Sequence, residues 1–213
     1  MQALERTITD SNWITLILMT LFVFVFLLKG VSVRRLKGNA SSLINRGFIE
    51  KEIEDNNPFF NLFQVLIFLF SMTVLSLTVY KIVLFYTVVI LQGFSTFMII
   101  FGLVFSYFAC KLLLEFSIAF LFKIDKQVKF FLISKSSYLY AVSFILLIGL
   151  ILVAYSQLDT LFLIYFSGVL YSIRFILHVA SNKKLIFNEL FYFILYLCAF
   201  EIAPLFILFK LLF

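Results

Sequence analysis

The stretch FFNLFQVLIFLFSMTVLSLTVY, residues 59–80, decides the fold. Its 22 residues include no charged side chain, and a helix of that length can cross the hydrocarbon core of a bilayer. The strands of a transmembrane barrel alternate between apolar and polar residues over about ten positions, and this run is longer and unbroken. The stretch therefore predicts a transmembrane helix.

Five similar segments lie on either side of this stretch. Together they predict an all-α, polytopic transmembrane helix bundle that forms a single membrane domain, residues 1–213. Hydrophobic residues make up 64% of the chain and charged residues 13%, whereas a soluble domain has about 25% charged residues. The expected spans are residues 12–28, 59–80, 94–122, 138–155, 160–179 and 187–213, and residues 29–58 are expected to form a cytoplasmic loop.

The Lys and Arg residues are crowded in alternate loops, and this pattern predicts the orientation. The first, third and fifth loops hold twelve of them, and the opposite side holds only Arg6, Lys81 and Lys210. Basic loops are retained in the cytoplasm, so we expect both termini to be extracytoplasmic. Basic residues beside the spans suit anionic lipids. Membrane lipids are therefore expected partners, and nucleic acid is not.

The first loop begins basic and ends acidic. Its apolar residues have the spacing of a short interfacial helix; they are Leu43, Ile44, Phe48, Ile49 and Ile53. Two interpretations stay open, a solvated linker and a docking surface for a partner.

Five ionisable residues within the apolar segments are the candidate functional site. Each costs about 2.5–3.5 kcal/mol at the centre of a span, so such residues usually face protein or water. Lys111 and Glu115 are four residues apart and share a helix face, as do Arg174 and His178. Glu201 is expected near the midplane, in contact with Arg174 or otherwise Lys111. This buried polar cluster is either structural or a site for an ion, a proton or a substrate.

Pro204 follows Glu201 by three residues and predicts a kink in the last span. Proline cannot donate to the carbonyl of Phe200, which leaves a free acceptor close to Glu201. Cys110 and Cys198 lie in apolar segments without metal-ligand spacing. No catalytic or nucleotide-binding motif is present. We therefore expect no catalytic residue, no metal and no cofactor.

The C-terminal run FYFILYLCAFEIAPLFILFKLLF, residues 191–213, resembles the closing signature of an uncharacterised family of small Bacteroidota membrane proteins. The family is a domain of unknown function, and Lys111 in the third span is also similar to its pattern. The resemblance implies a multi-pass protein of the bacterial inner (cytoplasmic) membrane and supplies no catalytic residues. The signature is matched by Tyr196, Leu197, Cys198, Glu201, Ile202, Pro204 and Lys210.

Three functions follow as alternatives. The first is an integral inner-membrane subunit that scaffolds or anchors a bacterial cell-envelope complex, with a protein partner or further copies of the chain. The lack of catalytic motifs and of a large soluble domain favours it. The second is a small transporter or lipid-linked-substrate carrier that uses Glu201, Arg174 and Lys111. The third is an intramembrane lipid-modifying enzyme, which would need an unrecognised acid–base pair.

Overall fold

The computed structural model describes residues 12–43, 47, 61–86, 93–122, 126–156, 158–181 and 210, without the side chains of residues 114–132 and 179–181. All regular structure in these ranges is helical, which confirms the expected all-α class. The helices are α1 (Asn12–Val31), α2 (Val33–Ala40), α4 (Leu62–Tyr86), α5 (Phe94–Phe122), α6 (Lys126–Tyr155) and α7 (Thr160–Ser181).

Five of these helices are long and apolar enough to cross a membrane, in whole or in part: α1, α4, Phe94–Leu113 of α5, Ile133–Tyr155 of α6 and Thr160–His178 of α7. The described chain is thus that of a multi-pass membrane protein. The expected sixth span, residues 187–213, lies outside the described residues except for Lys210. The total of six spans, their limits in the bilayer and the side on which each terminus lies stay predictions.

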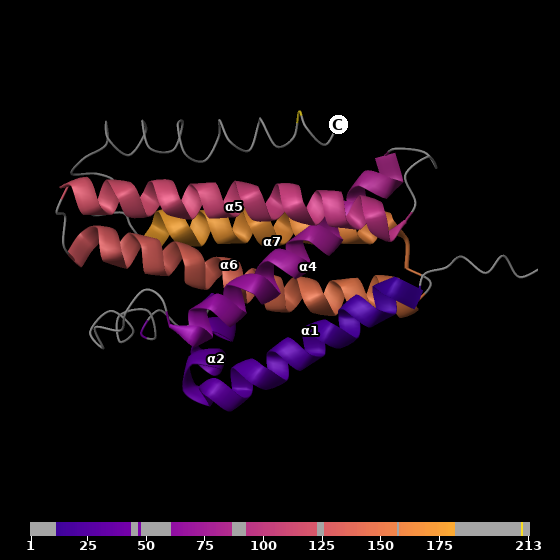
Figure 1. The fold of residues 1–213 in the computed structure, drawn as a ribbon, viewed down its shortest axis with the longest axis horizontal. Helices are drawn as coiled ribbons and strands as arrows, with labels where there is room; N and C mark the ends of the chain where they lie inside the picture. The colour runs from indigo at the N-terminus through magenta and orange to yellow at the C-terminus, as the bar shows by residue number, and fades with distance from the viewer. Residues whose placement is uncertain are drawn as a thin grey trace, which may run out of the picture.

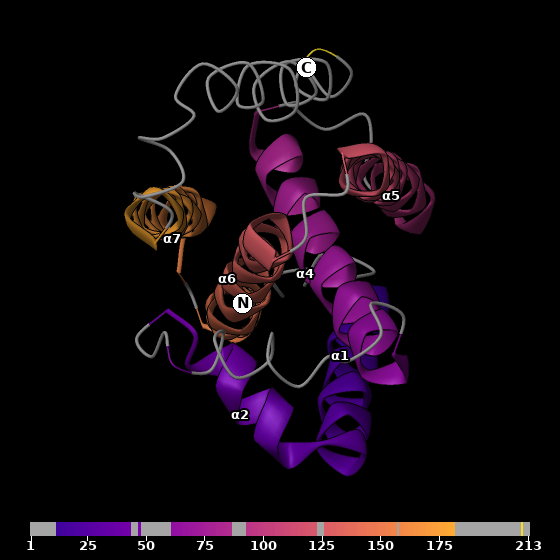
Figure 2. The same ribbon diagram turned by 90° about the vertical axis from the view of Figure 1, so that its left-hand side faces the viewer.

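Helix α4 lies at the centre of the bundle and packs against α1, α5, α6 and α7 (Figure 2). In the membrane-length parts of α4 and α6, 56% of the residues are buried, compared with 22% in α1 and 17% in α5 and α7. Consecutive long helices run in opposite directions (Figure 1). The bundle thus has two inner helices, and α1, α5 and α7 each leave a broad apolar face uncovered by described residues.

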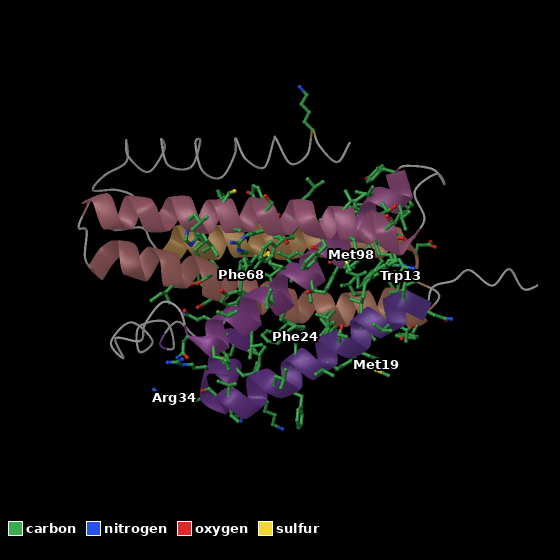
Figure 3. All side chains as sticks on the ribbon, viewed as in Figure 1. Trp13, Met19, Phe24, Arg34, Phe68 and Met98 are labelled. Carbon is green, nitrogen blue, oxygen red and sulfur yellow. The ribbon has the colours of Figure 1, made fainter. Side chains whose placement is uncertain are left out.

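Aromatic side chains join the helices inside the bundle. Trp13 of α1 packs against Tyr80, Phe94 and Phe97, with ring centroids 5.1–5.9 Å apart. Phe70 of α4 and Phe144 of α6 have centroids 4.8 Å apart. Lipid is as apolar as these side chains, so close packing rather than hydrophobic burial draws the helices together. Trp13 and Arg34 lie at opposite ends of the bundle (Figure 3).

Two helices extend beyond the spans expected for them. Helix α4 continues past residue 80 to Tyr86, and α6 begins at Lys126 rather than near residue 138. Backbone groups at a membrane surface are satisfied best within a helix, and neither extension contains Gly or Pro to interrupt it. As a result Lys135, which the sequence counts among loop residues, lies on α6 and is only 7% exposed.

Candidate functional site

The inward face of α7 changes from apolar to basic along its length. Leu163, Ser167, Leu170 and His178 are all buried and recur every three or four residues, the spacing of one helix face. Arg174 falls on the same stripe. Its Nε atom is buried and has no hydrogen-bond partner among the described residues. The basic residues lie in the half of α7 that ends at Ser181.

Helix α5 shows the same change on its own inward face. Phe97, Ile100 and Val104 are buried, and Tyr107 and Lys111 continue the stripe in part-buried positions. The Nζ atom of Lys111 lies 5.9 Å from the centroid of the Tyr107 ring, a cation–π contact. Lys111 makes further interactions as well. Glu115 follows one turn later on the α5 backbone, and its side chain lies outside the described residues.

The two basic stripes reach the same depth in the bundle. The Tyr171 hydroxyl is close enough to both Arg174 and Tyr107 for electrostatic interaction. Helices α5 and α7 run in the same direction on either side of α4 (Figures 1 and 2). Lys111 and Arg174 each lie about one turn beyond these tyrosines, and therefore at a similar depth on α5 and α7.

His178 belongs to a neighbouring contact between α7 and α6. Its ring meets that of Tyr138 edge to face, with centroids 6.5 Å apart, and both side chains are buried. Lys135 and Ser134 are buried about one turn before Tyr138 on α6. Sequence reasoning missed these α6 residues because it placed Lys135 in a loop. The run SKSSYLY, residues 134–140, continues into the apolar segment without Gly or Pro, and that continuity was the available signal.

In the part of the chain that the structure describes, three cations lie in the same half of the bundle: Lys111, Lys135 and Arg174. These three residues are called the basic layer. Asp159 is the one acidic side chain described, and it lies at the other end, in the turn between α6 and α7. Within the described ranges, no group of three His, Cys, Asp or Glu side chains could hold a metal ion. Glu201 and Pro204 lie outside the described residues, so the contact of Glu201 with Arg174 stays a prediction.

A second feature is the short helix α2, which is fixed to the bundle at its basic end. Ser32 caps the helix by accepting a hydrogen bond from the backbone N–H of Arg35. The Ser42 hydroxyl is fully buried, 3.1 Å from the backbone carbonyl of Ser137 on α6. Leu43 packs beside Ile133 and Tyr138. The outer face exposes Arg34 and Lys37, next to Lys29 at the end of α1.

The family described as Domain of unknown function (DUF4271) matches residues 14–212. The chain belongs to the DUF4271 family. Apart from the first two residues of α1, the match covers all the described helices, so the DUF4271 domain includes both the basic layer and α2. This confirms the expected membership of an uncharacterised family, whereas the Bacteroidota source and the C-terminal signature stay predictions. No curated protein and no solved structure matches the chain.

Proposed function

We propose that this protein is an integral subunit of the bacterial inner membrane that scaffolds or anchors a cell-envelope complex. The observation that carries the proposal is the fixed position of α2. Residues 32–43 are held against α6 by the buried Ser42 hydroxyl and by Leu43. A docking element that is already ordered loses less conformational entropy on binding than a flexible linker would.

The surface that α2 presents suits an acidic protein partner. Arg34 and Lys37 are exposed on α2, and Lys29 is exposed just before it. Charge complementarity of this kind speeds association and selects the partner. The same basic residues also agree with a cytoplasmic position for this end of the bundle.

In-cell photo-crosslinking tests the scaffold function. A benzoylphenylalanine at position 37 should give an adduct of discrete mass with one partner protein. The matched control is position 158, which is exposed in the α6–α7 turn at the opposite end. Replacing Arg34 and Lys29 with Gln should weaken the adduct. Identical patterns at positions 37 and 158, or lipid adducts alone at position 37, would contradict a scaffold role for α2.

A second function, a carrier for lipid-linked anionic substrates, is favoured by the inward position of Lys111 and Arg174. Cations inside transmembrane segments commonly mark substrate pathways. Lipid mass spectrometry on the purified protein should then show a co-purifying anionic lipid. The lipid should be lost in Arg174→Gln and retained in Lys37→Gln. Equal lipid content in both variants would contradict the carrier function.

A further inference from the structure

The face of α1 that points away from the bundle carries a regular apolar stripe. Helix α1 packs mainly on α4 and α2, and its buried residues, such as Leu21 and Leu28, lie on the opposite face. The outer residues are alternately three and four positions apart, the spacing of a seam between two packed helices. Met19, one of them, lies on the outer side of α1 (Figure 3). The α1 stripe consists of Leu16, Met19, Val23 and Phe26, which are between 57% and 76% exposed in the part of the chain that the structure describes.

The α1 stripe leads directly into the basic surface of α2. Lys29 follows Phe26 by about one turn, and a single residue, Ser32, separates α1 from α2. Lys29 and Lys37 are both exposed. One continuous surface therefore changes from an apolar helix of membrane length to exposed cations. A protein that binds α2 must bind directly beside the end of this helix.

We propose that the partner of α2 is itself a membrane protein, whose transmembrane helix packs along the α1 stripe and whose acidic flank binds Lys29 and Lys37. The inference rests on the proposed scaffold function and specifies its partner. Cations beside a bilayer attract anionic lipid head groups, so a soluble acidic protein would have to compete with lipid for α2. A protein held in the same membrane meets α2 at a much higher effective concentration.

The charge at the end of the α1 stripe selects among membrane proteins. The end that carries α2 is expected to face the cytoplasm, and most transmembrane helices have Lys or Arg at their cytoplasmic flank. Such a flank would repel Lys29 and Lys37, whereas a flank with Asp or Glu would be attracted, so the same charges reject wrong partners and retain the right one. A second copy of this chain in the same orientation would bring its own cations to this end. The stripe adds close packing, because lipid tails are as apolar as its side chains.

Photo-crosslinking from the α1 stripe in whole cells tests the inference. A benzoylphenylalanine at position 26 should capture the same protein as one at position 37. Mass spectrometry should place the cross-linked peptide in an apolar segment long enough to cross a membrane, with Asp or Glu directly after it on the side of α2. The matched control is position 176, which lies five residues before the end of α7, as position 26 does in α1, and is 63% exposed. The control should not capture this protein.

Two sets of variants measure the apolar and the charged contacts separately. Val23→Ala combined with Phe26→Ala should reduce the adduct from position 37 several-fold, whereas Ile176→Ala should leave it unchanged. Lys29→Gln combined with Lys37→Gln should reduce the adduct from position 26 several-fold, and Lys29→Arg combined with Lys37→Arg should preserve it. Yields are compared at equal amounts of the protein in the membrane, so a variant that folds poorly does not imitate a lost contact.

The outcomes separate this inference from the scaffold function. A soluble protein captured from position 37, with no effect of the α1 variants, would overturn the membrane partner and leave the scaffold function intact. Lipid adducts alone at position 26, an adduct between two copies of the chain, or a captured helix without an acidic flank would also overturn it. The absence of any protein adduct at both positions 26 and 37 would overturn the scaffold function as well.

Discussion

At the scale of single residues, Gly149 allows α6 and α7 to pack closely. A Cβ atom at this position would lie 2.9 Å from Cε1 of Phe166 and 3.7 Å from Cδ1 of Leu163. The Phe166 ring is in turn stacked on Phe162, with centroids 5.5 Å apart. Small residues let transmembrane helices approach each other where bulkier ones would hold them apart. Gly149 is therefore a packing residue between two helices that carry parts of the basic layer.

Gly149→Ala should destabilise the protein because the added methyl group forces the Phe166 ring to move. Overpacking of this kind costs about 1–3 kcal/mol in the free energy of unfolding. The control is Gly30→Ala in α1, where nothing lies within 4 Å of the added atom. There the change should be neutral or stabilising by up to about 1 kcal/mol. Thermal unfolding in detergent micelles measures both, and equal shifts would contradict a close contact at Gly149.

The spacing of charged residues predicted part of the candidate site. Lys111, Arg174 and His178 were singled out because each interrupts an apolar segment, and all three occupy inward stripes in one half of the bundle. Lys135 was missed because charge counting assigns a lysine at the edge of a span to a loop. The partner of Arg174 could not be worked out from spacing, because it depends on which helices become neighbours.

At the scale of elements, α2 shows how a loop segment becomes part of the bundle. The sequence predicted an interfacial helix that begins near Leu43, and this stays a prediction because most of that segment lies outside the described residues. The described helix α2 is a separate element at Val33–Ala40. Ser32 explains its start, because its extended backbone ends α1 and its side chain caps α2. Leu43 follows α2 and packs against the bundle. The other apolar residues of that expected stripe lie outside the described residues.

Ser42→Ala should loosen the attachment of α2, because it removes the hydroxyl shared between the carbonyls of Asn39 and Ser137. The expected loss in the free energy of unfolding is about 0.5–1.5 kcal/mol. The neighbour Ser41 is the control, because its hydroxyl also donates to a backbone carbonyl but is exposed. Ser41→Ala should change stability by less than about 0.5 kcal/mol. Limited proteolysis between α1 and α4 should accelerate only in Ser42→Ala, and equal cleavage rates would argue against the docked position.

At the scale of the whole molecule, hydropathy predicted six spans, of which five are membrane-length helices in the described residues, but it did not predict their arrangement. Helix α1 is at least as apolar as α4, yet far less of it is buried. Lipid and protein interiors are similarly apolar, so hydropathy marks a span without showing which other helices it contacts. The central position of α4 follows instead from side-chain packing such as that of Phe68 (Figure 3), whose ring centroid lies 6.1 Å from that of Phe105 of α5.

The distribution of charge over the bundle leads to a prediction of orientation. Lys29, Arg34, Lys37 and Lys126 lie at one end, and Asp159 lies in the turn at the other (Figure 1). Loops rich in Lys and Arg are retained in the cytoplasm, so the end that carries α2 should face inward.

Ser41 and Asp159 are exposed at opposite ends and can each be replaced by cysteine in a background free of Cys110 and Cys198. In spheroplasts, a membrane-impermeant maleimide should label position 159 at once and position 41 only after the membrane is permeabilised. Full labelling of both positions after lysis is the control for reactivity. Labelling of position 41 in sealed spheroplasts would reverse the orientation and place α2 outside the cell, where a cytoplasmic partner could not reach it.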